Sequence, residues 1–232
     1  MLWGLKPVEQ QAAYGLAVQR LKRQVHLGLL LPGERMPAER KLAEQIGISR
    51  VTLREALRVL ETEGYVSIRR GATGGAFVAE EGRLRQMALK HLSSDPTDVM
   101  RIFEYRYAVE PMAAELATLR RTPGDLRRID EAAGEIERAE TVGLLRRGEA
   151  AFHLAVACAS ANRFIATSIE EALASLFLPL ADGDLSVLRA RSLLIRGQVA
   201  EAIYARREAV AAQRMRVVIE DEQGRLPSYK AA

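Results

Sequence analysis

Three arginines at four-residue spacing are the first side chains in the sequence whose pattern suggests a chemistry. Arg50, Arg54 and Arg58 recur every fourth residue, which places them on one side of a helix. A row of like charges is unfavourable unless an anion lies beside it, and a guanidinium group binds both phosphate oxygens and the edge of guanine. The row therefore predicts a helix that contacts DNA, and the alternative is a solvated charged face.

A helix over residues 49–63 is expected to position this row. Ser49 is a favourable N-cap, and Gly64 is a favourable residue after the last turn. The other side of the helix carries an apolar stripe for the core, formed by Leu53, Ala56, Leu57 and Leu60. A short helix over 38–46, ended by Gly47, precedes it, so the two are expected to form a helix-turn-helix. An earlier helix is indicated by Val18, Leu21, Val25 and Leu29.

Two short β-prone segments follow and are expected to pair as a hairpin. They cover residues 65–68 and 76–78, and glycines dominate the tip between them. A hairpin behind a helix-turn-helix is a wing, and Arg70 on it is expected to contact phosphate or to enter the minor groove. Gly71 permits a close approach of the backbone to DNA.

The residues expected to face DNA lie on the wing and at the helix starts. In a helix-turn-helix the first turns of the second helix touch base edges, and the start of the short helix suits a phosphate contact. The predicted DNA-binding residues are Arg40, Ser49, Arg50, Thr52, Arg54, Arg70 and Gly71.

The charge of the chain is unevenly distributed. Residues 1–80 contain twelve Lys and Arg against eight Asp and Glu, whereas the remainder contains twenty-two of each, so the net charge of +4 lies in the first third. This excess agrees with a polyanionic partner. The single cysteine, Cys158, excludes an internal disulfide. With no signal peptide and no apolar span of ~20 residues, a cytoplasmic protein without membrane contact is expected.

The N-terminal motifs resemble the signature of the GntR family of bacterial regulators. The matching stretches are PGERMPAERKLA at 32–43 and GISRVTLREAL at 47–57, extended by Leu60, Gly64 and the wing sequence GGAFV at 74–78. The resemblance implies a transcriptional regulator in which the predicted DNA-binding residues face DNA.

Beyond residue 82 the pattern is almost wholly helical. Helices are expected near 83–93, 97–120, 124–141, 144–160, 162–178, 185–205 and 206–222. We therefore predict a mainly α protein with two domains. A winged helix-turn-helix with a small β-hairpin wing would span 1–79, and an antiparallel all-α bundle of six or seven helices would span 80–232, with a linker at about 79–82.

The helical region resembles the FadR branch of the same family, whose effector domain, of the FCD type, is an all-helical bundle. The matching residues are Glu104, Arg106, Glu110, Phe152, His153, Asn162, Ala202, Ile203 and Met215. Many members hold a divalent metal with an Asp and histidines. Glu149 and His153 would supply one ligand pair, but Arg196 and Val218 stand where the later histidines fall. Because a guanidinium cannot ligate a metal, the site is predicted to be lost, and no cofactor is expected.

The helical domain is also expected to bind an effector and to form the dimer. The branch commonly senses small carboxylates or fatty acyl compounds, and the position of Arg106 often lines the pocket. Arg196 either pairs with Glu149 or binds an anionic effector directly. The candidate effector-binding residues are Arg106, Glu149, His153 and Arg196. The alternatives are a surface salt bridge between Arg106 and Glu110, a core histidine at His153, and an Arg196 that points to solvent.

The leading interpretation is a DNA-binding regulator, expected to be a repressor, that is controlled by a small acidic metabolite. It would bind a palindromic double-stranded operator as a homodimer, because a two-fold protein matches a two-fold site. Two alternatives stay open: a metal-dependent member of the branch with a site at Glu149 and His153, and an architectural DNA-binding protein without a ligand. An enzyme is not expected, because the sequence has no nucleophile elbow, phosphate-binding loop or zinc-protease motif.

Overall fold

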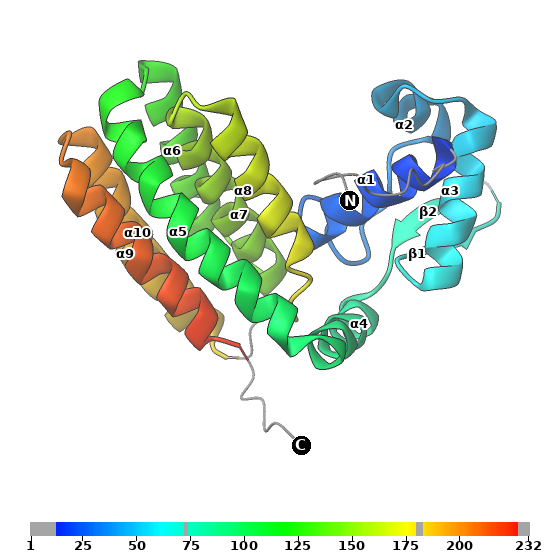
Figure 1. Cartoon of the computed structure of the whole chain (residues 1–232). Helices are drawn as coiled ribbons and strands as arrows, with labels where there is room; N and C mark the ends of the chain where they lie inside the picture. The colour runs from blue at the N-terminus through cyan, green and yellow to red at the C-terminus, as the bar shows by residue number, and fades with distance from the viewer. Residues whose placement is uncertain (1–12, 72–73, 180–182, 227–232) are drawn as a thin grey trace, which may run out of the picture.

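Ten helices and one two-stranded sheet make up the part of the chain that the structure, a computed structural model, describes: residues 13–71, 74–179 and 183–226. The N-terminal elements are α1 (Ala13–His26), α2 (Glu39–Ile46), α3 (Arg50–Glu63), β1 (Val66–Arg69) and β2 (Gly75–Val78). They are followed by α4 (Glu81–Ser94), α5 (Pro96–Arg120), α6 (Pro123–Glu137), α7 (Val142–Ala159), α8 (Arg163–Ser175), α9 (Leu185–Tyr204) and α10 (Glu208–Gly224). Figure 1 shows α5 to α10 as a bundle on one side, the N-terminal elements on the other, and α4 near the joint.

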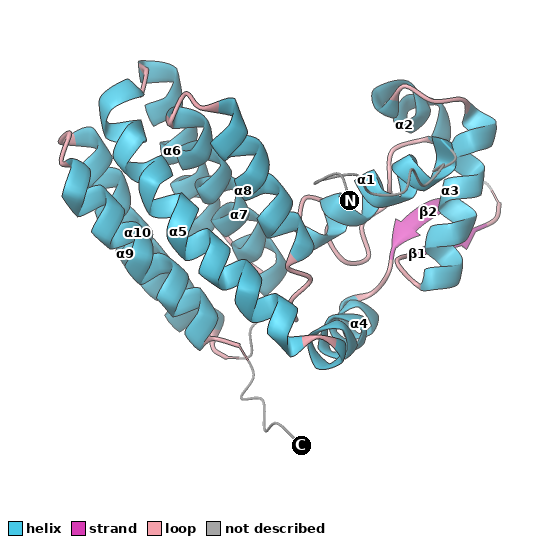
Figure 2. Ribbon diagram, viewed as in Figure 1, coloured by secondary structure: helices cyan, strands magenta, loops and turns pink. Residues whose placement is uncertain are grey.

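The N-terminal elements form the expected winged helix-turn-helix. Gly47 ends α2 with a φ of +78°, in the left-handed region that favours glycine, and the chain turns there into α3. The apolar stripe of α3, which includes Leu53 and Leu60, is buried in a core shared with α1 and α2. β1 and β2 pair antiparallel, with Val66 opposite Val78. The hairpin therefore follows α3 directly, and in Figure 2 its strands are the two magenta arrows beside that helix.

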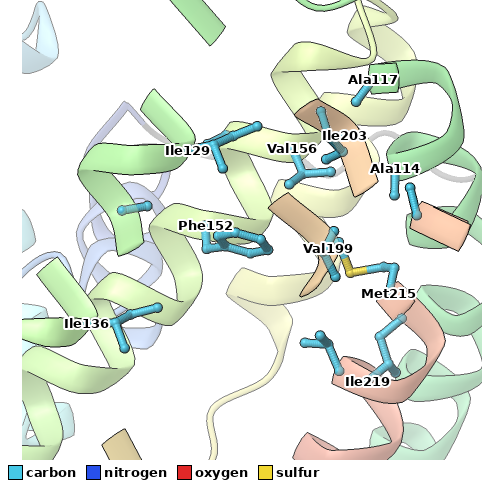
Figure 3. Close-up of a cluster of buried hydrophobic side chains, with 14 of the residues drawn as sticks. Ala114, Ala117, Ile129, Ile136, Phe152, Val156, Val199, Ile203, Met215 and Ile219 are labelled. Carbon is cyan, nitrogen blue, oxygen red and sulfur yellow. The ribbon is translucent and has the colours of Figure 1, made fainter. Parts of the chain in front are cut away.

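The C-terminal elements form an all-α bundle whose helix starts are set by the local sequence. The side chains of Asp95, Thr122, Thr141, Asn162 and Asp184 cap α5 to α9, each accepting a hydrogen bond from a backbone N–H of the first turn. Figure 3 shows the core between these helices, which includes Ala114, Ala117, Ile129, Ile136, Phe152, Val156, Val199, Ile203, Met215 and Ile219. Among the described helices, none has the length and apolar character that crossing a membrane requires.

The boundary between the two domains differs from the predicted one, whereas the break between the last two helices lies close to its predicted position. α4 begins at Glu81, inside the segment 79–82 that we expected to be a linker, and its Leu84 and Ala88 are buried in the N-terminal core. α9 and α10 are separated just after Tyr204, where Arg206 has a φ of +55°. Because this conformation is uncommon for residues other than glycine, the sequence marks that break only weakly.

Each domain buries a side chain of the other where the two domains meet. Leu27, which follows α1, is buried with Ala113 and Leu173 of the bundle. Phe177, which follows α8, is buried in the N-terminal core and stacks on the ring of His26, with ring centroids 4.3 Å apart. The N-terminal domain is therefore packed against the bundle at the point where α1 ends.

Candidate functional site

The start of α3 is ordered by contacts between two side chains. Oγ of Ser49 accepts a hydrogen bond from the backbone N–H of Thr52 at 3.1 Å, and the two side-chain hydroxyl oxygens lie 2.8 Å apart. Ser49 is therefore the N-cap, as predicted. The cap fixes the first turn, from which Arg50 and Arg54 are exposed to solvent.

The arginine row on α3 is exposed along its whole length. Arg54 is oriented by Glu39 of α2, whose carboxylate lies 2.8 Å from Nε. Arg50 and Arg58 have no ion-pair partner among the described residues. Their charge is therefore available to an external anion, and α3 is the helix of this domain that lies farthest from the bundle in Figure 1.

The wing places Arg70 directly beyond the last strand pair. Arg70 is exposed, and Gly71 has a φ of +102°, which glycine adopts without strain. Arg35 donates a hydrogen bond of 2.6 Å to the carbonyl oxygen of Gly74, so the segment before α2 braces the wing. Ala72 and Thr73, at the tip, lie outside the described residues.

Two further residues at the helix starts bear on DNA contact. Arg40, in the first turn of α2, is exposed and lies 2.9 Å from Glu44, a surface pair of the kind that is weak. Val51, in the first turn of α3, is 68% exposed although it is apolar. Val51 is not among the predicted residues, although the sequence shows it as an apolar residue outside the buried stripe of α3. In this position its side chain suits contact with a thymine methyl group.

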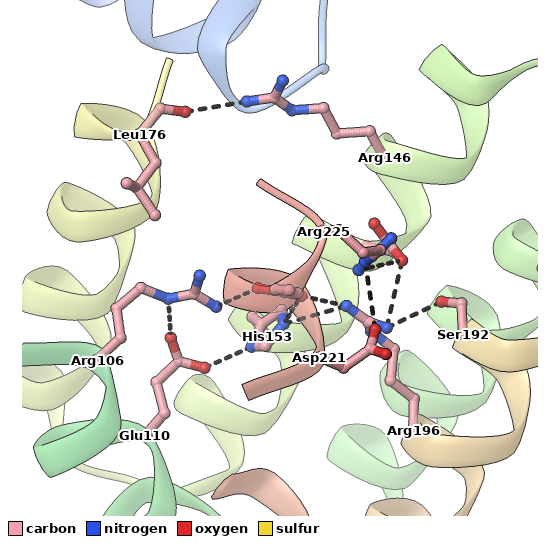
Figure 4. Close-up of polar contacts among 11 residues, drawn as sticks. Arg106, Glu110, Arg146, His153, Leu176, Ser192, Arg196, Asp221 and Arg225 are labelled. Carbon is pink, nitrogen blue, oxygen red and sulfur yellow. Dashed lines mark hydrogen bonds and ion pairs between the residues drawn. The ribbon is translucent and has the colours of Figure 1, made fainter. Parts of the chain in front are cut away.

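A buried network of charges, which includes Arg106, His153 and Arg196, lies between the helices of the bundle (Figure 4). Its hub is Glu222 of α10. One carboxylate oxygen accepts a hydrogen bond of 2.8 Å from Nε2 of His153 and another from Arg196, and the second oxygen lies 2.8 Å from Nη2 of Arg106. Cations from α5, α7 and α9 thus converge on one carboxylate. The sequence analysis missed Glu222, because nothing distinguishes it there from glutamates on exposed helix faces.

His153 lies between two carboxylates. Its Nδ1 contacts Glu110 and its Nε2 contacts Glu222, so the ring donates from both nitrogens in its protonated form. Burial lowers the pKa of His153, but the two carboxylates outweigh burial and raise that pKa above its usual value. Against its own burial, Arg106 and His153 hold the pKa of Glu222 well below its usual range. The two carboxylates therefore favour the imidazolium form of His153.

The arginines of the network are internal. Arg196 is 1% exposed, so it does not point to solvent, and its Nη1 lies 3.3 Å from the carboxylate of Glu149. Pairing with Glu149, one of the two roles expected for Arg196, is therefore present. Arg225 reaches the same carboxylate at 3.1 Å. Arg106 and Glu110 also pair, but both side chains are 2% exposed, so this is not a surface salt bridge.

The residues at the position of the implied metal site do not fit a divalent ion. Glu149 is paired with two guanidinium groups, both ring nitrogens of His153 face carboxylates, and Val218 is fully buried in the apolar core. Among the described residues, no three His, Cys, Asp or Glu side chains form a group that could hold a metal. Arg196 supplies in this place the positive charge that an ion would supply.

A cavity of about 390 Å³ adjoins the network and extends to the joint between the domains. Small-molecule sites have volumes of roughly 300–1,000 Å³. Of the predicted effector-binding residues, Arg106, Glu149 and His153 line the cavity, and Arg196 is not among its lining residues. Lining residues that the sequence analysis missed are His26, Arg146, Glu222 and Arg225. His26 comes from the N-terminal domain, so only the packing of the two domains brings it here.

Comparison with known families covers both parts of the chain. Residues 13–78 match the family described as bacterial regulatory proteins, gntR family. Residues 101–221 match the FCD domain, and this match alone covers more than half of the chain. The two matches coincide with the winged helix-turn-helix and with the helical bundle.

Named relatives are transcriptional regulators. The chain is 39% identical over 136 residues to a putative L-lactate dehydrogenase operon regulatory protein of Escherichia coli K12, a match that covers 56% of this chain and 52% of the relative. It is 30% identical over 163 residues to the Exu regulon transcriptional regulator of the same strain, covering 70% of this chain and 62% of that protein. The chain thus spans about half the length of the first relative. Neither name describes an enzyme, in agreement with the sequence-based expectation.

A solved structure shows the same fold. E. coli McbR/YncC matches with a TM-score of 0.57 and 24% sequence identity, over 92% of this chain and 97% of that chain. The likeness extends over both domains. With the two family matches, it leads to one conclusion: the chain belongs to the GntR family of bacterial regulatory proteins and carries an FCD domain behind its winged helix-turn-helix.

Proposed function

We propose that the protein is a transcriptional regulator that binds a specific operator through α3 and the wing, and that a small organic anion in the 390 Å³ cavity controls this binding. The observation that carries the proposal is the composition of the cavity wall, which combines charged residues of the bundle with His26 of the DNA-binding domain. A ligand there would contact both domains. It can change operator affinity only if it binds two arrangements of the protein differently.

On the DNA side, residues at the helix starts and on the wing are proposed to make two kinds of contact. Base edges would be read from the first turns of α3, and phosphates would be bound at α2 and the wing. The residues are Ser49, Arg50, Thr52 and Arg54 for the first role, and Arg40, Arg70 and Gly71 for the second. A homodimer on a palindromic operator, acting in the cytoplasm where the DNA lies, fits this arrangement.

On the ligand side, the chemistry of the wall supports an anion held without metal. Arg106, Arg146 and Arg225 line the cavity together with apolar side chains such as Leu145 and Leu173. A guanidinium group binds a carboxylate directly, and Arg196 occupies the implied metal position. We therefore propose a small acidic metabolite as the effector, and no metal cofactor.

We further propose that the ligand-free protein is the DNA-binding form and acts as a repressor. Leu27 and Phe177 are buried across the joint, and this packing gives the winged helix-turn-helix one orientation. A fixed orientation lowers the ordering cost of engaging two half-sites. A ligand at the joint would remove that advantage and release the operator.

The test begins with selection of an operator from random DNA by the full chain. Thermal shifts are then measured with L-lactate (prompted by the name of one relative), other monocarboxylates, sugar acids, acyl-CoAs and divalent metals, each with and without chelator. A ligand at one hundred times its Kd adds about 2.7 kcal/mol, which moves Tm by several degrees, at roughly 2–4 °C per kcal/mol. We expect a chelator-insensitive shift from an acid, and release of operator by that acid. A shift that requires metal would favour the metal-dependent alternative, and indifference to DNA sequence would favour the architectural one.

A further inference from the structure

Arg146 of α7 is a cation of the cavity wall that has no carboxylate counterion in the described part of the chain. Arg106 and Arg225 each lie against carboxylates, whereas the guanidinium group of Arg146 donates hydrogen bonds to three backbone carbonyls. No carboxylate among the described residues lies within ion-pair distance of it. Burial lowers the pKa of Arg146 to about 10, against the more distant pull of Glu149 and Glu222. A partly buried cation without a nearby carboxylate is stabilised more by an incoming anion than a cation that is already paired with a carboxylate.

The carbonyls that Arg146 holds belong to both domains. Its Nη2 donates to the carbonyl oxygens of His26 and Leu176, each at 2.9 Å, and its Nη1 donates to that of Leu178; Figure 4 shows the contact with Leu176. His26 is the last residue of α1, while Leu176 and Leu178 follow α8. One guanidinium group therefore ties the end of α1 to the bundle at the edge of the cavity.

His26 extends this tie to the DNA-reading elements. Burial lowers the pKa of His26 to about 4, so its ring is neutral. The carbonyl of Ala174 can only accept, so Nδ1 donates to it at 2.8 Å, and Nε2 accepts from the hydroxyl of Tyr65 at 2.9 Å. Tyr65 lies between α3 and β1. A continuous chain of contacts thus runs from the cavity through Arg146 and His26 to Tyr65, which connects the end of α3 to the first strand of the wing.

We propose that Arg146 binds the anionic group of the ligand and thereby loosens its hold on the carbonyl of His26, so that one side chain both recognises the ligand and transmits its binding. The proposal rests on the proposed function, namely that the cavity takes a small organic anion. A carboxylate adds a Coulombic attraction that a neutral carbonyl lacks and can accept two parallel hydrogen bonds from a guanidinium group, so the anion competes with the carbonyls for Arg146. The remaining wall includes Leu27, Leu145, Leu173 and Leu226, which suits a monocarboxylate with an apolar body.

Ligand binding is tested with saturated monocarboxylates from acetate to decanoate and with L-lactate, each compared with its uncharged amide by calorimetry on the full chain. Arg146→Ala is expected to weaken carboxylate binding by roughly 10- to 100-fold and amide binding by less than about threefold, because it removes hydrogen bonds to a charged group. The matched control is Arg147→Ala, since Arg147 is the next residue on α7 and lies 3.4 Å from Glu135. Unchanged carboxylate binding by a folded Arg146→Ala protein would overturn the assignment of Arg146 as the anion-binding residue.

Transmission is tested with Arg146→Lys, which retains the charge but not the planar group that spans the carbonyls. This variant is expected to bind the carboxylate within about tenfold of the natural protein, yet its affinity for the selected operator should no longer change with ligand. Hydrogen exchange of residues 24–30 should rise with ligand in the natural protein, and should already be raised without ligand in Arg146→Ala and Arg146→Lys. A ligand response in Arg146→Lys as large as in the natural protein would contradict the transmitting role, and this variant serves if Arg146→Ala does not fold.

The measurements distinguish a failure of the proposed function from a failure of the role assigned to Arg146. If no acid binds the natural protein, the proposed function is wrong and this inference falls with it. If acids release the operator equally from the natural protein and from both Arg146 variants, the proposed function stands and the role of Arg146 is wrong.

Discussion

Arg196 lies 3.3 Å from the carboxylate of Glu149 inside the bundle, where the family resemblance implies two ligands of a metal ion. An ion pair thus joins the two residues that the resemblance places at the metal site. Arg196 also contacts Glu222, which in turn contacts His153 and Arg106. Because breaking one buried pair leaves an uncompensated charge, removing any one of these side chains is expected to lower the free energy of unfolding of the protein.

The first prediction concerns metal. Protein purified without chelator is expected to contain well under one divalent ion per chain, because Arg196 repels a cation at this position. Arg196→His removes that charge and adds an imidazole beside Glu149 and His153, so it is expected to bind about one Zn²⁺ per chain. Elemental analysis and Zn²⁺-dependent thermal shifts measure both. A stoichiometric ion in the natural protein would show that the network rearranges around a metal.

The second prediction concerns the hub of the network. Glu222→Gln removes the carboxylate on which Arg106, His153 and Arg196 converge, and it is expected to lower the free energy of unfolding by about 3–5 kcal/mol. Urea unfolding at neutral pH measures the change. Glu137→Gln, on the exposed side of α6, is the control and should stay within about 0.5 kcal/mol. A loss below about 1 kcal/mol in Glu222→Gln would mean that solvent replaces the carboxylate without penalty.

Features that depend on local sequence rules could be predicted. Ser49 caps α3 because its side chain accepts from the first turn, Gly47 ends α2 because glycine adopts positive φ, and the hairpin follows from β-prone segments around glycines. Each of these rules involves residues only a few positions apart. The exposed face of α3 follows from the same local pattern, since the buried stripe determines which side remains for DNA.

Features that depend on tertiary packing could not be predicted. Glu222 and Arg225 meet the predicted residues only because α10 packs against α5 and α9 in the bundle, and Arg146 joins them because α7 also packs against α5. A charged residue on a helix is usually exposed. His26 belongs to the N-terminal domain, and its contacts with Phe177 and with Ala174 of α8 bring it to the cavity. A contact across a domain joint leaves no periodic signal in either segment.

The third prediction concerns pH and follows from His26. Its pKa is lowered from 6.5 to about 4 in the folded protein, with burial as the main cause. The unfolded chain therefore binds more protons between these values, so this contribution to stability is present above pH 6.5 and is lost as pH falls towards 4. At pH 5 the loss amounts to about 2 kcal/mol. Urea unfolding at pH 7, 6 and 5 measures it.

The control for this pH dependence is the variant His26→Asn, which keeps a donor near the carbonyl of Ala174 but cannot titrate. The natural protein should lose about 2 kcal/mol more than His26→Asn between pH 7 and pH 5, while carboxylates that titrate in both proteins cancel in the difference. Equal slopes in the natural protein and His26→Asn would mean that the joint admits water and that His26 is solvated there.

The last prediction separates base contacts from phosphate contacts. Arg50→Ala is expected to cost roughly 1–3 kcal/mol on the selected operator and much less on random DNA, because Arg50 has no partner in the described residues and projects from the first turn of α3. Arg70→Ala should weaken both complexes similarly and reduce the salt slope by about 1, as a phosphate contact does. Fluorescence anisotropy over a range of salt concentrations measures these effects, with Arg101→Ala, at an exposed arginine of α5, as the control for net charge. Equal losses on operator and random DNA in Arg50→Ala would assign Arg50 to phosphate, and base reading would then lie with Arg54 and Val51.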